Sequence, residues 1–149
     1  RNKVKYIAPY VYMIHGIDSI KLLTAVNKEA IKFGRIIDVL LQFHIAEELS
    51  KFGFVQSDVE LLKDINIQQE FQGVRVRGVM GMATNTLNKD QIRSEFIQLR
   101  TYFDILKSKC FREDSFDTLS MGMSGDYVIA MEEGSTMIRV GSLIFGPRD

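Results

Sequence analysis

The chain has 149 residues, of which 46% are hydrophobic and 26% charged, the balance of a soluble globular protein with a sizeable core. Its 19 basic residues cancel its 19 acidic ones. The charge therefore gives no indication of nucleic acid, a membrane surface or an acidic substrate as a partner.

A single cysteine, Cys110, excludes a disulfide within the chain and is typical of a reducing compartment. No apolar run approaches the roughly 20 residues that span a bilayer, and the opening RNKVKYIAP lacks the apolar region of a signal peptide. We therefore expect a cytoplasmic protein. Two histidines without clustered cysteines or carboxylates predict no metal site.

Strand-like and helix-like segments alternate along the chain, which predicts βα units with parallel strands. Short apolar runs bounded by turns are typical of strands that are buried on both faces. Five such strands are expected, over residues 12–15, 37–43, 74–82, 118–123 and 137–140.

Helix start signals lie between these strands. Asp18 or Ser19 can cap the first long helix, and Ser57 with Glu60 forms a capping box for the next. The longest helix is expected to begin at Asn88. Its apolar residues recur at helical spacing and should lie on the sheet: Ile92, Phe96, Leu99, Phe103 and Leu106.

The chain is predicted to form a single domain over residues 1–149, because no linker, low-complexity tract or close repeat divides it. Consecutive βα units with parallel strands predict an α/β fold of the TIM (β/α)8 barrel type. Five units fall short of the eight that close a barrel, for which about 250 residues are usual. We therefore expect a partial barrel that lacks its beginning.

Two turns rich in glycine and serine follow the last two expected strands, with a short helix over residues 126–133 between them. Gly122 lets the backbone approach a ligand closely, Ser124 offers a hydroxyl, and Gly141 with Ser142 offers a second pair of donors. In (β/α)8 barrels the corresponding loops bind phosphate. For either loop alone, the alternative is that the glycines make turns and the serines cap helices.

Arg139 interrupts the apolar final strand, where an unpaired guanidinium would be costly to bury. It should therefore point into the mouth of the barrel or, alternatively, pair with a carboxylate such as Asp117. His15 and His44 end two apolar runs on the side where barrels carry function. Both a structural hydrogen bond and a role as a base are open for them.

Five segments carry a family resemblance: YMIHGIDS at 12–19, VLLQFHIAEELSKFGF at 39–54, RGVMGMAT at 77–84, FDTLSMGMSGDY at 116–127 and GSTMIRVGSLIFG at 134–146. Together they resemble the pyridoxal phosphate homeostasis protein family, whose fold is the barrel domain of alanine racemase. The resemblance covers the whole chain. It implies a protein that binds pyridoxal 5′-phosphate (PLP) and acts in vitamin B6 and amino-acid homeostasis without catalytic turnover.

The same resemblance implies roles for individual residues. Arg139 would face the pyridine nitrogen of PLP and keep it unprotonated, which makes the cofactor a poor electron sink. The phosphate of PLP would be surrounded by Ser120, Met121, Ser124, Gly141 and Ser142.

The opening RNKVKYI resembles the end of the family's third strand, so strands 4 to 8 are expected here and the first three are expected to be absent. In the family, the lysine that holds PLP covalently ends the first strand, and no position of this sequence matches that motif. All ten lysines fall in expected helices or loops. We therefore expect no covalent attachment of PLP and no catalytic residue.

Two other hypotheses stay open. An enzyme resembling alanine racemase would need a base on each face of its substrate, and neither base is visible in the sequence. The other hypothesis is a fragment without activity.

An open sheet also predicts exposed parallel edges at residues 12–15 and 137–140. Copies of the chain, or a missing N-terminal piece, would associate through those edges.

Overall fold

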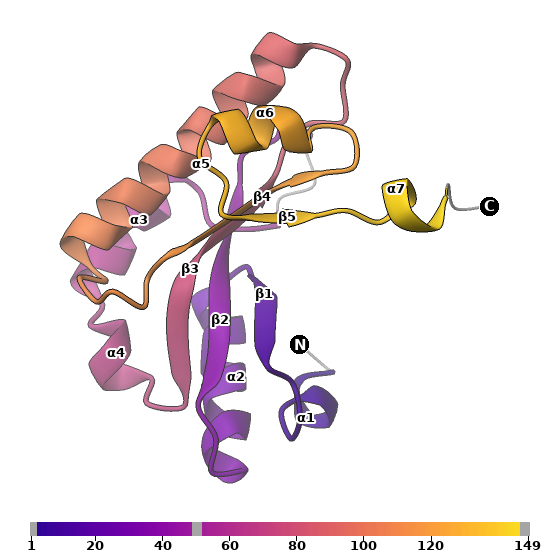
Figure 1. Ribbon diagram of the computed structural model, residues 1–149. Coiled ribbons are helices and arrows are strands. Elements are labelled where there is room, and N and C mark those ends of the chain that lie inside the picture. Colours follow the sequence, from indigo (N-terminus) through magenta and orange to yellow (C-terminus); the bar gives the residue numbers. More distant parts are fainter. Residues whose placement is uncertain (1–2, 49–51, 147–149) are drawn as a thin grey trace.

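A computed structural model describes residues 3–48 and 52–146, where five parallel strands form one sheet in chain order. The strands are β1 (Met13–Ile17), β2 (Ile37–His44), β3 (Val74–Met82), β4 (Thr118–Met123) and β5 (Met137–Arg139). The sheet is strongly twisted, with the long helices packed along one side of it (Figure 1). This order and direction are those of neighbouring strands in a (β/α)8 barrel, and the predicted partial barrel is confirmed.

Helices connect these strands: α1 (Val4–Ile7), α2 (Ile20–Lys32), α3 (Gln56–Asp64), α4 (Ile67–Glu70), α5 (Lys89–Lys109), α6 (Tyr127–Glu132) and α7 (Ser142–Phe145). The Oγ of Ser19 accepts a hydrogen bond from the Leu22 N–H at 3.3 Å, which caps α2. The side chain of Asn88 caps α5 in the same way by accepting from two backbone N–H groups. The starts predicted for these two helices are confirmed.

The capping box predicted at Ser57 is wrong. The N-cap of α3 lies two residues earlier, at Val55, and the helix begins at Gln56. Val55 has an extended backbone because the chain is still paired with β2 at the preceding residue. The Val55 N–H therefore donates to the Asp58 carboxylate at 2.8 Å, and Glu60 pairs with a lysine of its own helix instead.

The ends of three strands also differ from the prediction. β1 begins at Met13 and continues to Ile17, which is fully buried and lies opposite Leu41 of β2. β2 continues to His44, which pairs with Met82 of β3. β5 ends at Arg139, the last residue with a partner on β4. In each case the pairing with the neighbouring strand sets the end, and a single sequence does not show that pairing.

The two faces of the sheet differ in character. On β2 every second residue is buried in the hydrophobic core with the helices: Ile37, Val39, Leu41 and Phe43. The predicted stripe of α5 is buried in the same core and is confirmed: Ile92, Phe96, Leu99, Phe103 and Leu106. Because side chains alternate along a strand, Asp38, Gln42 and His44 lie on the opposite face, which we call the inner face.

Ion pairs occupy the inner face near the amino ends of the strands. The buried Asp38 accepts hydrogen bonds from Arg75 at 2.7 and 3.0 Å and from Arg77 at 3.0 Å. Arg77 also donates to Asp117 at 3.2 Å. These groups satisfy one another, as buried charges must. Charged groups that could bind a ligand are therefore expected at the opposite end of the sheet, at the carboxyl ends of the strands, which is the functional side of such barrels.

Candidate functional site

Arg139 ends β5 and lies half-buried on the inner face. Its Nη1 donates to the Oγ of Ser120 at 2.5 Å and its Nη2 to the carbonyl oxygen of Gly81 at 3.0 Å. The alternative pairing with Asp117 is wrong, because that carboxylate accepts from Arg77. Burial lowers the pKa of the Arg139 guanidinium, which still carries its charge at neutral pH. The guanidinium is thus held across three strands and keeps N–H groups for a ligand.

The charge of Arg139 affects the pKa of His15 on β1. Burial lowers the pKa of His15, and the positive charge of Arg139 lowers it further. The imidazole is therefore neutral near pH 7, with one nitrogen able to accept a hydrogen bond. His44, the second predicted candidate, lies on β2 and lines a different pocket.

The two predicted phosphate loops lie together. The Oγ of Ser124, in the loop after β4, accepts hydrogen bonds from the N–H groups of Gly141 at 3.3 Å and Leu143 at 3.4 Å, in the segment after β5. With Arg139 and Ser142, these loops line an open cavity of about 500 Å³, a size typical of ligand sites. The structure therefore brings together four of the six predicted site residues, Ser124, Arg139, Gly141 and Ser142.

Backbone donors are available at this cavity. Within residues 3–48 and 52–146, the N–H groups of Ser124, Gly125 and Ser142 donate to no protein acceptor. Free amides beside a half-buried guanidinium suit an anion, because the charge-assisted hydrogen bonds that they form are about twice as strong as neutral ones. The cavity can therefore hold a phosphate group next to Arg139.

The two remaining predicted residues are placed differently. The side chain of Ser120 is fully buried, and its hydroxyl accepts from Arg139 and orients it. Met121 is fully buried in the core on the helix side of β4. Neither side chain lines the cavity, so their contact with phosphate stays a prediction.

Gly122 has a structural role at the end of β4. Its φ is 98°, and a Cβ at this position would lie 2.7 Å from the Cβ of Ala130 on α6. The glycine therefore allows α6 to pack against the end of β4, and its predicted close approach to a ligand stays a prediction.

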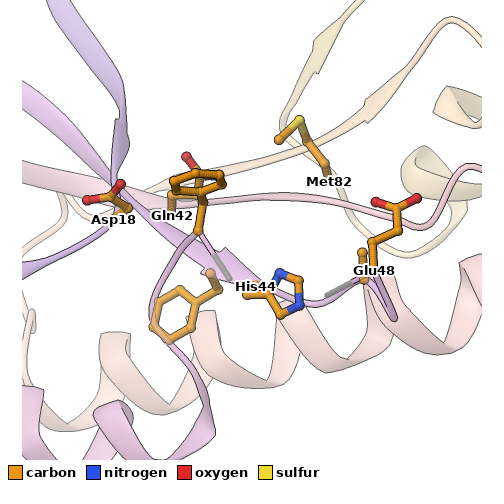
Figure 2. A pocket seen from close by; sticks show the side chains of 8 residues that line it. Asp18, Gln42, His44, Glu48 and Met82 are labelled. Carbon is orange, nitrogen blue, oxygen red and sulfur yellow. The ribbon is translucent and has the colours of Figure 1, made fainter. Parts of the chain in front are cut away.

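A second pocket lies beside the carboxyl ends of β1, β2 and β3 (Figure 2). The labelled side chains around it come from the loop after β1, from β2 and its following loop, and from the end of β3: Asp18, Gln42, His44, Glu48 and Met82. Glu48 and Met82 also line a third cavity, which shares Met123 and Gly125 with the phosphate cavity. Concave surface therefore extends along this whole edge of the sheet.

One residue near the site was not predicted. Glu95 on α5 is a buried carboxylate that accepts two hydrogen bonds from Thr84, in the loop after β3. The only sequence signal is its position, directly before Phe96 of the apolar stripe. A charged residue at that place on a helix needs a partner when it is buried, but the sequence does not identify the partner.

Other kinds of site find no support in the part of the chain that the structure describes. Every lysine described there lies on a helix or just before α1, and Lys51 falls outside the described residues. No cluster of three metal-binding side chains occurs among the described residues. Nor is any helix within them long and apolar enough to cross a membrane.

The fold defines a barrel domain of the alanine racemase type: the chain belongs to the family described as alanine racemase, N-terminal domain, which it matches over residues 2–149. Among curated relatives, it is 34% identical over 147 residues to the pyridoxal phosphate homeostasis protein of Aquifex aeolicus. That match covers 99% of this chain and 63% of the relative, so the chain spans about three fifths of the relative's length.

Solved structures agree with this assignment. The structure of PipY from Synechococcus elongatus with PLP bound is 32% identical, with a TM-score of 0.81 over 97% of this chain and 66% of PipY. A D-threonine aldolase from Filomicrobium marinum, 16% identical with a TM-score of 0.72, covers 97% of this chain and 40% of the aldolase. At that identity the likeness shows the fold alone. The predicted resemblance is confirmed by the family match and by the named relatives.

Proposed function

We propose that this chain binds PLP at the cavity between the loops after β4 and β5, as part of a protein of vitamin B6 and amino-acid homeostasis. The observation that carries the proposal is the joint position of free backbone amides, Ser124, Ser142 and the half-buried Arg139 at one cavity. The relatives' names and the PLP bound to PipY support the choice of cofactor.

Each group has a distinct part in the proposed binding. The amides of Ser124, Gly125 and Ser142 donate to the phosphate, and Arg139 donates to the pyridine nitrogen. When bound, PLP supplies an electron sink whose strength depends on protonation of that nitrogen. Because a guanidinium donates and does not accept, it keeps the nitrogen unprotonated and holds the cofactor in a weakly reactive state. This arrangement suits carriage of the cofactor better than catalysis.

Equilibrium ultrafiltration with three ligands tests the proposal. PLP should bind saturably at one site per chain, and pyridoxal, which lacks the phosphate, about tenfold more weakly or worse. Pyridoxamine 5′-phosphate lacks the aldehyde and should bind about as well as PLP, because no lysine linkage is proposed. Equal retention of PLP and pyridoxal would contradict the phosphate site. A chain mass raised by the cofactor after borohydride reduction would contradict non-covalent binding.

We further propose that the chain catalyses no turnover of amino acids. A racemase is the alternative, since it needs two bases and the same cofactor. Incubation with L-alanine and PLP, followed by chiral chromatography, should show no inversion above that of PLP alone. Sustained inversion would favour the enzyme.

The cytoplasmic location expected from the lone cysteine stays a prediction.

Association through the sheet edges is also proposed. β1 and β5 are the outer strands of the described sheet, and exposed aromatic side chains come before one and after the other in the chain: Tyr12 directly before β1 at 76% exposure, and Phe145 on α7, after β5, at 86%. Unpaired parallel edges with apolar neighbours favour pairing with another chain. The sedimentation coefficient should therefore rise with protein concentration, and less steeply in Phe145→Glu. One monomeric species at every concentration would contradict this expectation.

A further inference from the structure

A buried carboxylate anchors two loops at the edge of the sheet that carries the cavities. Glu95 on α5 is only 6% exposed. Its Oε2 accepts the backbone N–H of Thr84 and its Oε1 the Thr84 hydroxyl, each at 2.7 Å. The Thr84 Oγ1 in turn accepts the N–H of Glu47 at 3.0 Å. One carboxylate therefore fixes the loop after β3 and, through Thr84, the loop after β2.

This anchor lies close along the chain to a partner of Arg139. Thr84 follows Gly81 by three residues, and the carbonyl oxygen of Gly81 accepts from Arg139 Nη2 at 3.0 Å. Gly81 also packs tightly against α5, since a Cβ at this position would lie 2.8 Å from a methyl group of Leu99. The path of residues 81–84 is thus set by α5 at both of its ends.

We propose that Glu95 is a positioning residue for Arg139: by anchoring Thr84 it fixes the carbonyl of Gly81, which holds the guanidinium in place. The significance of this role for PLP rests on the proposed function. The position of Arg139 itself does not, because it can be measured without any ligand.

His15 provides the measurement. The charge of Arg139 contributes to the lowered pKa of His15, so a displaced guanidinium lets that pKa rise. The chain has only two histidines, and a His44→Gln variant assigns the NMR signal of His15. Arg139→Gln gives the reference value, in which the positive charge is gone.

The main variant is Glu95→Gln, in which one carboxylate oxygen becomes an NH2 group and a donor of Thr84 loses its acceptor. The expected result is a rise in the pKa of His15 toward the Arg139→Gln value. Loss of the negative charge at position 95 would by itself lower the pKa of His15. The sign of the change therefore separates a displaced Arg139 from a direct charge effect.

Three further variants complete the test. Thr84→Val removes the hydroxyl without a change of charge and should also raise the pKa of His15, whereas Thr84→Ser should keep the original value. Asp104→Asn, in an exposed pair with Arg100 on the same helix, is the matched control and should change nothing. An unchanged pKa of His15 in folded Glu95→Gln overturns the proposal. If that variant does not fold, the pKa of His15 is measured in Thr84→Val, and an unchanged value there overturns the proposal. A raised pKa together with absent PLP binding by the unaltered chain would refute the proposed function alone.

Discussion

Replacing Arg139 by glutamine is expected to weaken PLP binding about 10- to 100-fold. A hydrogen bond to a charged group contributes about 1.5–3 kcal/mol, and each 1.4 kcal/mol corresponds to about a tenfold change in affinity. Glutamine can still donate to Ser120 or Gly81, so the surrounding sheet keeps a partner at this position. Equilibrium ultrafiltration measures the loss, and circular dichroism confirms that the variant is folded.

A double-mutant cycle shows which part of PLP the arginine contacts. The second ligand is a PLP analogue with a ring carbon in place of the pyridine nitrogen. Arg139→Gln should weaken PLP strongly and the analogue little. Equal losses for both ligands would assign Arg139 to the phosphate and contradict its contact with the ring nitrogen. Arg100→Gln, which removes an exposed arginine paired with Asp104, is the control and should leave both affinities unchanged.

Replacing Gly78 by alanine should cost about 3 kcal/mol or more of the free energy of unfolding. Gly78 lies on β3 opposite Thr118 of β4, and a Cβ at this position would lie 1.7 Å from the Thr118 carbonyl oxygen. The obstacle is backbone and cannot rotate away, so β3 and β4 must separate locally. Overpacking of this kind is among the recognised causes of large destabilisation. Urea denaturation followed by circular dichroism measures it.

Gly125→Ala is the matched control for this substitution. A Cβ at Gly125 would meet no atom within 4 Å, and its φ lies outside the positive range. The free energy of unfolding should change by less than about 0.5 kcal/mol. A similar stability of the two alanine variants would show that β3 and β4 do not approach as closely at Gly78 as the structure describes.

The fold could be predicted from the sequence because its signals are local and repeated. Short apolar runs alternate with capped helices, and the bounds of β3 and β4 agree with the prediction residue by residue. The prediction of a capping box at Ser57 was wrong because Phe54 pairs with Phe43, and α3 begins directly after that pairing, at an earlier residue than predicted. That pairing joins distant residues, and a pattern of neighbouring residues carries no information about it.

The site could be predicted in part, because some of its residues also give local signals in the sequence. The serine and glycine loops and Arg139 stand out by type and position, and the structure places them at one cavity. For Met121, only the family resemblance predicts a place beside the phosphate. Packing against the helices places its side chain in the core, so that contact stays a prediction. Glu95 could not be assigned, since its partner Thr84 is brought close only by the contact of α5 with β3.

The hydroxyl of Ser124 already accepts from the N–H of Gly141, which lines the cavity, and from the N–H of Leu143. If a phosphate binds here as proposed, one of its oxygens can replace this hydroxyl, so those two hydrogen bonds are exchanged and not added. When the phosphate leaves, the hydroxyl of Ser124 can accept from the same two N–H groups again. Under the proposed function, the bound and unbound states therefore have similar numbers of hydrogen bonds, which favours moderate affinity and ready release of the ligand.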